Sequence, residues 1–193
     1  MKSFRIVLIS VALAGFTQPA VAQYLSQGVE FVNAVRDRDG AKAQELIQAH
    51  PNLIDAKDEK GETALIVALS RGDEEYTSYL LTKGADPNAS GKAGETPLIA
   101  AARIGYEEGV EWLLSSGAKV DMANRMGETP LIVAVQQRRT AVVKVLLSSG
   151  ADPDKTDNAA GLSARDYAAR DPRAREILNL IQAKKPKASA SAR

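Results

Sequence analysis

The chain has 193 residues, of which 45% are hydrophobic and 25% are charged, and its formal net charge is +1. This composition is that of an ordinary globular domain, so it excludes a disordered chain and a protein with several membrane spans. The chain has no cysteine and a single histidine, His50. This excludes disulfides, thiolate metal sites and cysteine nucleophiles, and it leaves little room for imidazole chemistry.

The first 22 residues have the three regions of a secretory signal peptide. Two basic residues precede an apolar run over residues 6–16, and small residues follow at Ala20 and Ala22, the two positions that a signal peptidase reads. This run is shorter than the roughly 20 residues that a membrane-spanning helix needs. We therefore expect cleavage between Ala22 and Gln23, a short linker over 23–27, export to the periplasm and no membrane span in the mature chain.

The two ends differ in charge from the part between them. Residues 184–193 contain four basic residues, no acidic residue and no large apolar residue, so we predict a disordered basic tail. Residues 23–183 contain 19 basic and 24 acidic residues, a net charge of −5. A mildly acidic body is a poor ligand for nucleic acid, so we expect no nucleic-acid partner.

Two short patterns recur along the body at a spacing of 33 residues. One is Gly-Glu-Thr followed by Ala-Leu or Pro-Leu, and it begins at Gly61, Gly94 and Gly127. The other is a Leu-Leu pair that is followed three residues later by Gly-Ala. In the first pattern the glycine suits a positive φ, the threonine caps a helix, and the proline fits the first helical turn. Each repeat is therefore predicted to be a turn followed by two short helices, the second ending at a glycine.

A 33-residue repeat of this kind, with Gly-x-Thr-Pro-Leu opening the first helix and Leu-Leu-x-x-Gly-Ala-Asp-x-Asn closing the second, resembles the ankyrin repeat. The resemblance implies an all-α fold, a solenoid of paired antiparallel helices joined by β-turn or hairpin loops. It covers residues 28–183, with a cap at each end. The five repeats, caps included, are predicted over 28–57, 58–90, 91–123, 124–157 and 158–183.

The chain departs from the family pattern at one position of the first helix. The family usually has histidine after Thr-Pro-Leu, where it ties neighbouring loops by hydrogen bonds, but this chain has Ile66, Ile99 and Ile132. We expect an apolar seam between repeats at these positions, stabilised by burial at ~25 cal/mol per Å². The usual network between loops is in doubt.

The phase of the repeats also places individual residues. The last repeat begins one residue late, and we place the extra residue between Lys155 and Asp157. Trp112 falls at an inward position of a second helix, so we interpret it as a core residue. Gly109, unusual inside a helix, is expected to make room for Tyr76 or another neighbour.

No arrangement of residues typical of an enzyme occurs, so we predict no catalytic residue, no cofactor and no metal site. His50 falls at the end of a second helix, where we interpret it as structural. Asp152, Asp154 and Asp157 crowd one loop and leave an alternative open, an ion-binding or enzymatic role for residues 152–157. Their spacing does not match that of an EF-hand.

The resemblance also implies where a partner binds. Stacked repeats form a concave side of turn tips and first helices, whose exposed side chains the fold leaves free. The positions that project from this side in the family correspond here to Lys57, Glu59, Lys60, Ser70, Arg71, Ser90, Lys92, Arg103, Ile104, Arg125, Met126, Gln136 and Gln137.

Basic residues are frequent in this set although the body is acidic. This favours a groove of locally positive character that receives an acidic segment of an envelope or periplasmic protein, with Ile104 and Met126 as apolar contacts. The alternatives are an ordinary solvated surface and self-association through the caps, although we expect a monomer. The resemblance to small exported bacterial proteins implies a non-catalytic interaction scaffold, for example an accessory factor of a stress-related envelope enzyme.

Overall fold

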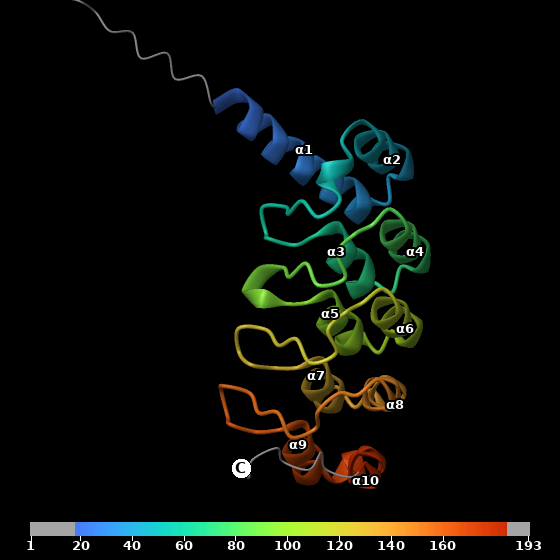
Figure 1. Cartoon of the computed structure of the whole chain (residues 1–193), viewed down its shortest axis with the longest axis vertical. Coiled ribbons are helices and arrows are strands. Elements are labelled where there is room, and N and C mark those ends of the chain that lie inside the picture. The colour runs from blue at the N-terminus through green and yellow to red at the C-terminus, as the bar shows by residue number, and fades with distance from the viewer. Residues whose placement is uncertain (1–17, 185–193) are drawn as a thin grey trace, which may run out of the picture.

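The structure is a computed structural model that describes residues 18–184, with side chains from Leu25 onward. Helices stack in pairs along one axis (Figure 1). The α-helices within this range are α1 (Gln18–Asp37), α2 (Gly40–Ala49), α3 (Ala64–Ser70), α4 (Glu74–Thr82), α5 (Pro97–Ile104), α6 (Glu107–Ser115), α7 (Pro130–Gln136), α8 (Thr140–Ser148), α9 (Ala164–Arg170) and α10 (Arg175–Ala183). Short 3-10 helices lie at η1 (Pro51–Leu53), η2 (Lys92–Gly94) and η3 (Pro172–Ala174).

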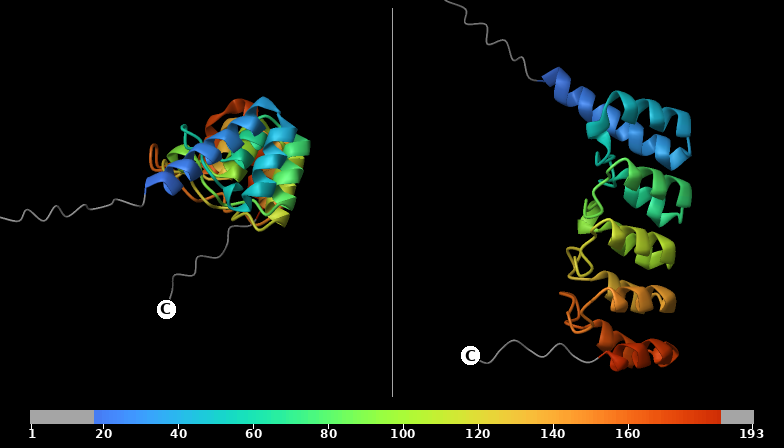
Figure 2. Two further views of the ribbon diagram at one scale, coloured as in Figure 1. Left: turned by 90° about the horizontal axis from the view of Figure 1, so that it is seen from above. Right: turned by 45° about the vertical axis from the view of Figure 1, so that its right-hand side comes forward.

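The helices form two rows. Each first helix contacts the next one along the stack; these are α1, α3, α5, α7 and α9. The second helices lie beside them and are α2, α4, α6, α8 and α10 (Figure 2). Hairpin loops project from the side of the first helices and join each pair to the next (Figure 1). The prediction of an all-α solenoid of paired helices with hairpin loops is confirmed.

Threonine begins each of the three central first helices. The hydroxyls of Thr63, Thr96 and Thr129 accept hydrogen bonds from the amide three residues later, at 3.3, 3.1 and 3.2 Å. Pro97 and Pro130 follow two of these threonines at the first helical position, which needs no amide donor. The predicted use of the Gly-Glu-Thr pattern as a helix start is therefore confirmed.

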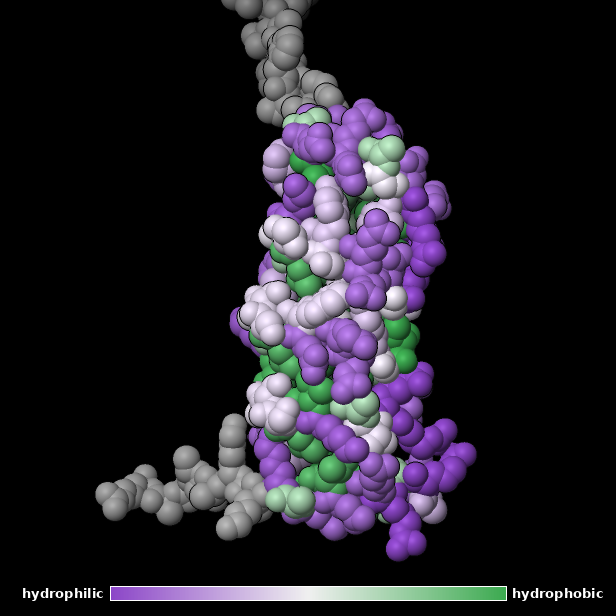
Figure 3. All heavy atoms as spheres, turned by 90° about the vertical axis from the view of Figure 1, so that its right-hand side faces the viewer, coloured by the Kyte–Doolittle hydropathy of each residue, from purple (hydrophilic) through white to green (hydrophobic). Residues whose placement is uncertain are grey.

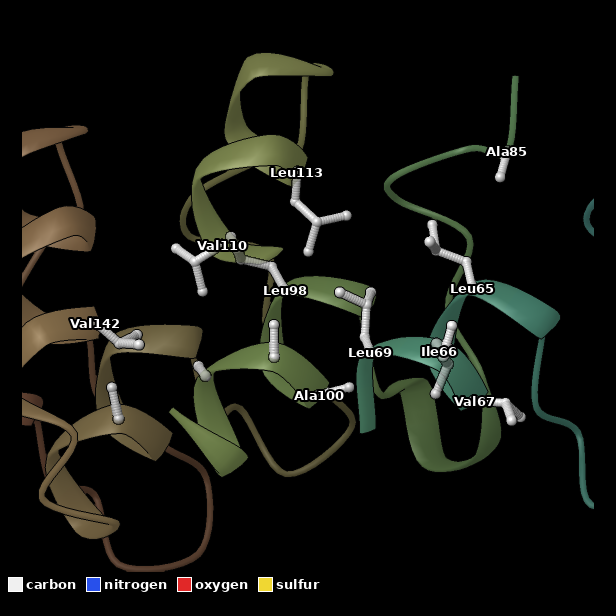
Figure 4. Packing of buried hydrophobic residues seen from close by; sticks show 14 of the residues in the cluster. Leu65, Ile66, Val67, Leu69, Ala85, Leu98, Ala100, Val110, Leu113 and Val142 are labelled. Carbon is white, nitrogen blue, oxygen red and sulfur yellow. The ribbon is translucent and has the colours of Figure 1, made fainter. Parts of the chain in front are cut away.

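The core is concentrated in the row of first helices. Six consecutive residues are buried in each central first helix, namely 64–69, 97–102 and 130–135. Such a helix is covered by its own second helix and by the first helices of both neighbouring repeats. Leu98 of α5 lies with Val110 and Leu113 of α6 in the space between the two helices (Figure 4).

The seam between repeats is apolar at the three isoleucine positions. Ile66, Ile99 and Ile132 are 2%, 0% and 0% exposed, as the sequence predicts. Neighbouring loops are nevertheless joined by hydrogen bonds, and residues other than the family histidine supply them. A side-chain oxygen in one loop accepts from an amide of the next loop in three places: Asp55 from Asp86 at 2.9 Å, Asn88 from Lys119 at 2.8 Å and Asp121 from Asp152 at 3.0 Å.

The extra residue of the last loop lies after Asp157, so its placement between Lys155 and Asp157 is wrong. In the hairpins that begin at residues 58, 91 and 124, the first amide donates to the carbonyl four residues later. In the last hairpin the Asp157 amide donates to the Leu162 carbonyl, five residues later, at 3.0 Å. The wider tip is closed by the Asp157 side chain, which accepts hydrogen bonds from three successive amides of the loop.

The two predicted terminal segments lie mostly outside the described residues. The apolar run of the signal peptide falls in residues 1–17, and the predicted tail falls in 185–193 except for Lys184, whose ammonium donates to the carbonyls of Leu147 and Ala151. The predicted processing positions Ala20, Ala22 and Gln23 lie within α1. Cleavage there stays a prediction, and it would leave the part of α1 from Gly28 onward that packs on the rest of the stack.

Candidate functional site

The tips of the hairpin loops are stacked directly on one another. The amide of Arg125 donates to the Ala93 carbonyl at 2.9 Å, and the amide of Asn158 donates to the Met126 carbonyl at 2.8 Å. The fit is close because glycine stands in each underlying turn: a Cβ at Gly94 would lie 3.1 Å from the Arg125 amide nitrogen. Gly94 also has a φ of +77°, which an L residue adopts only with strain.

This stacking brings predicted residues of three repeats into one row, which we call the hairpin edge. It consists of Lys57, Glu59, Lys60, Ser90, Lys92, Arg125 and Met126. All of them are exposed except Ser90, which is half-buried, and Met126 is 52% exposed. The ammonium groups of Lys57, Lys60 and Lys92 and the guanidinium of Arg125 make no ion pair with any residue that the structure describes.

The predicted residues at the carboxyl ends of the first helices have different surroundings. Arg103 pairs with Glu95 at 3.2 Å, and the Arg71 guanidinium donates to the carbonyl of Arg36. Ile104 is half-buried and lies against Gly72, where a Cβ would be 3.5 Å from the Ile104 Cδ1 atom. Among the described residues, four cations without an ion pair therefore lie at the hairpin edge, whereas Arg71 is the one such cation of the predicted set at the helix ends.

Three uncharged polar residues complete the predicted set at the helix ends. Ser70 and Gln137 are exposed, and Gln136 is half-buried near Tyr167. Among the described residues, no hydrogen bond joins Ser70, Gln136 or Gln137 to Lys92 or Arg125. The structure thus divides the thirteen predicted residues into two neighbouring groups.

Arg36 is a residue of this side that sequence reasoning missed. Its guanidinium donates to Asp58 at 2.5 Å and to Glu62 at 3.0 Å, which ties α1 to the first hairpin. Two hollows, of about 190 and 360 Å³, share Arg36 in their linings. One is also lined by Glu59 and Lys60, and the other by Ser70 and Arg71. The signal for Arg36 was its phase at the end of the first helix, which matches that of Ser70.

The electrostatics of this cluster favour an ionised Asp58. Burial acts to raise the pKa of Asp58, but hydrogen bonds from the Glu62 amide, the Arg36 guanidinium and the Lys60 amide outweigh it. The pKa of Asp58 therefore lies below its ordinary value. The pKa of Arg36 is raised by the same pairing with Asp58 and Glu62, against the effect of its burial.

The carboxylates of the acidic loop are engaged in separate contacts. Asp154 pairs with Arg165 at 2.7 Å, and Asp152 accepts a hydrogen bond from the Asp154 amide. Asp157 accepts from the Tyr167 hydroxyl at 2.5 Å, which lowers the pKa of Asp157. Among residues 18–184 no three histidine, cysteine or acidic side chains are grouped as metal ligands would be. These contacts join the loop to the last repeat and engage its carboxylates. The geometry therefore does not favour the alternative, an ion-binding or enzymatic role for residues 152–157.

The single histidine is also engaged in a local contact. His50 follows α2, where its amide donates to the Leu46 carbonyl. One ring nitrogen lies 3.3 Å from Gln27 of α1. This position suits the structural interpretation of the sequence, since the contact joins the two helices of the first pair.

Trp112 is not a core residue, so this interpretation of its phase is wrong. It is half-buried on the outer side of α6, because α4 and α6 leave a hollow between them there. Gly109 does make room for a neighbour, and that neighbour is Tyr106: a Cβ at Gly109 would lie 2.4 Å from the Tyr106 Cδ1 atom. Gly109 therefore lets the Tyr106 ring lie flat against the start of its own helix.

Comparison with protein families identifies the repeats. The family described as "Ankyrin repeats (3 copies)" matches residues 31–124 and 93–157. The chain belongs to the ankyrin repeat family. A search of curated proteins gives no match. Ankyrin repeats are generally non-catalytic and mediate protein–protein interaction, and the stacked edge of hairpins described above is a surface of the kind that such repeats offer.

Within residues 18–184, no helix is both long enough and apolar enough to cross a bilayer.

Proposed function

We propose that this ankyrin repeat chain is a non-catalytic scaffold of the periplasm that binds an acidic segment of an envelope or periplasmic protein along its hairpin edge. The observation that carries the proposal is the row of unpaired cations Lys60, Lys92 and Arg125 on three successive hairpin tips. A rigid row of like charges attracts a segment of opposite charge and selects against cationic partners. A stress-related envelope enzyme is the class of partner that we propose to test first.

The rigidity of the row supports this role. Arg125 and Met126 are fixed by hydrogen bonds of their own backbone to the hairpins on either side. A bound segment would therefore not have to order the loops, and ordering costs about 1–2 kcal/mol for each backbone residue. Met126 adds an exposed apolar side chain that adapts to the shape of a partner.

The test uses a chain in which Lys60, Lys92 and Arg125 are each replaced by glutamate. Binding of a labelled peptide of alternating glutamate and alanine is measured first, and affinity capture from a periplasmic extract is measured beside it. The matched control replaces Lys83, Lys119 and Arg175 by glutamate, which changes the net charge equally away from the hairpin edge. We expect loss of binding only in the first variant, and equal binding by both variants would contradict the proposal.

Export is tested separately, because the binding surface does not depend on it. We propose cleavage between Ala22 and Gln23, and the mass of the protein recovered from the periplasm measures this directly. A mature chain that begins at Gln23 would support the proposal, whereas a recovered chain that retains residues 1–22 would contradict it. Size-exclusion chromatography of the same material is expected to show a monomer.

A further inference from the structure

A wide hollow lies on the outer side of the stack, between the second helices α4 and α6. It has a volume of about 540 Å³ and is lined by Glu74, Glu75, Ser78, Tyr79 and Trp112. A second hollow of about 360 Å³ continues it toward the carboxyl ends of the two helices. The lining of this second part is Ser78, Leu81, Thr82, Trp112, Ser115 and Ser116. Because the two share Ser78 and Trp112, they form one groove, which we call the outer groove.

The outer groove exists because small polar side chains face each other across it. Ser78 and Thr82 on α4 and Ser115 on α6 are exposed and too short to close the space between the helices. The face of the second helices shows apolar surface between its polar side chains (Figure 3). The groove runs along the nine residues of α4, a length of about 13 Å at 1.5 Å per residue. Roughly four residues of an extended peptide have this length.

The indole of Trp112 is held in position. The rings of Tyr106 and Trp112 are in edge-to-face contact, with centroids 6.2 Å apart and an interplanar angle of 77°. Tyr106 is itself seated on Gly109, where any side chain would displace it. The aromatic surface in the groove is therefore ordered before any partner arrives.

Acidic residues line one end of the groove and flank it. Glu74 and Glu75 of α4 line the first hollow, and Glu107, Glu108 and Glu111 lie on α6 outside the two linings. Within the described part of the chain none of them makes an ion pair, although five other glutamates do. The helix dipole stabilises the four that stand in first turns. Glu111 stands beyond the first turn of α6, so that explanation does not apply to it.

Two observations describe the electrostatic surroundings of the aromatic rings at the groove. Burial raises the pKa of Tyr106, and the carboxylates of Glu74 and Glu108 raise it further. Carboxylates of both helices therefore act on the Tyr106 hydroxyl. At the other end, the ammonium of Lys83 lies 5.6 Å from the centre of the Tyr79 ring, a cation–π contact that the chain makes for itself.

We propose that the outer groove binds an extended, lysine- or arginine-bearing segment of a protein partner. The cation would lie over the face of Trp112, which is the best of the aromatic side chains for this contact. The unpaired glutamates would complement its neighbouring charges. The outer groove and the hairpin edge are opposite in charge and lie on different rows of the fold, so this proposal does not depend on the proposed function.

The test follows the fluorescence of Trp112, which is the only tryptophan of the chain. The probes are a blocked Lys-Pro-Arg-Lys peptide and its Glu-Pro-Glu-Glu counterpart. We expect a saturable change of emission with the basic peptide and none with the acidic peptide. Absence of a change with the basic peptide, or an equal change with both, would overturn the proposal.

Two variants make the assignment specific. Replacing Glu74, Glu75 and Glu108 by glutamine is expected to weaken binding of the basic peptide about tenfold, as for the loss of three exposed charge pairs. The matched control replaces Glu30, Glu45 and Glu176 by glutamine and is expected to bind as the unaltered chain does. Equal weakening in both variants would mean a general effect of charge and would overturn the site.

A second copy of the chain is the other occupant to be tested. Residues 184–193 carry four cations, and a peptide of this sequence serves as a third probe. Two results together would identify a second copy of the chain as the occupant and overturn the proposal of a separate partner. The tail peptide would bind more tightly than Lys-Pro-Arg-Lys, and sedimentation would show a dimer that the glutamine variant does not form. A monomer that binds the basic peptide more tightly supports the proposal as stated.

Discussion

The two rows of helices in this stack have the same number of members but different burial. The central first helices bury six consecutive residues each, whereas α4 buries two residues and α6 buries three. A first helix is enclosed by neighbours on several sides, while a second helix has its outer side in solvent. The comparison teaches that the first row carries most of the stability, and that the hairpin edge and the second row are available for binding.

Truncating a side chain in the first row should have the largest effect. Leu98 is 1% exposed, so Leu98→Ala is expected to lower the free energy of unfolding by about 2–5 kcal/mol, through lost burial and the cavity that remains. Leu114→Ala, at a half-buried position of α6, is the matched control and should cost less than half as much. Urea unfolding followed by circular dichroism measures both. Equal losses would contradict the division between the rows.

Breaking the link between α1 and the first hairpin should cause the next largest loss in the free energy of unfolding. Asp58→Asn removes a charge-assisted hydrogen bond to Arg36 and should lower stability at pH 7 by about 1.5–3 kcal/mol. Because the folded-state pKa of Asp58 is below 3.8, ionised Asp58 stabilises the fold above that value. This contribution is lost as the pH falls through the folded-state pKa.

The pH dependence separates this link from a simple loss of packing. Thermal unfolding of the unaltered chain should lose stability more steeply below pH 3.8 than that of Asp58→Asn. The two stability curves should converge at the lowest pH at which the chain still folds. Parallel curves would show that Asp58 keeps an ordinary pKa in the folded chain.

The capping threonines sharpen the comparison at the helix starts. Thr129 accepts a hydrogen bond from the Ile132 amide at 3.2 Å, so Thr129→Ala should cost about 1 kcal/mol. Thr140 begins α8 in the second row, where the preceding residue makes no side-chain cap. Thr140→Ala should therefore leave the midpoint of urea unfolding nearly unchanged. A larger loss at Thr140 than at Thr129 would reverse the order of the rows.

A small effect on stability is also expected at Trp112. Trp112→Val introduces the residue type found at the equivalent position of α8, Val145, and it removes the edge-to-face contact with Tyr106. Because Trp112 is half-buried, the change should cost less than about 1 kcal/mol in the free energy of unfolding. The same variant should lose the binding of the basic peptide, which calorimetry detects without the tryptophan signal. A loss of several kcal/mol would place Trp112 in the core after all.

Local signals made most of the fold predictable. Thr63, Thr96 and Thr129 cap helices in the way that their position in the repeat indicates, and the isoleucines after them are buried. These outcomes depend on contacts within a few residues or on the strict 33-residue spacing. Both kinds of information are written in the sequence itself.

The parts that sequence reasoning missed depend on what lies across from a residue. The phase of Trp112 predicts a core position, but the short side chains of Ser78 and Thr82 leave the space between α4 and α6 open. Likewise, the pairing of Arg103 with Glu95 removes a cation that the spacing counts as free. Spacing within one repeat indicates the direction of a side chain, but the size and charge of its neighbour decide the result.

The stacked hairpin tips make the array extendable. The third tip donates one amide, that of Arg125, to the tip before it and accepts at one carbonyl, that of Met126, from the tip after it. A further unit of 33 residues inserted between two such tips could donate an amide to the carbonyl of the tip before it and accept from the amide of the tip after it. The two end repeats of the array would not change. The hairpin edge therefore becomes longer by one hairpin for each repeat that evolution or design inserts.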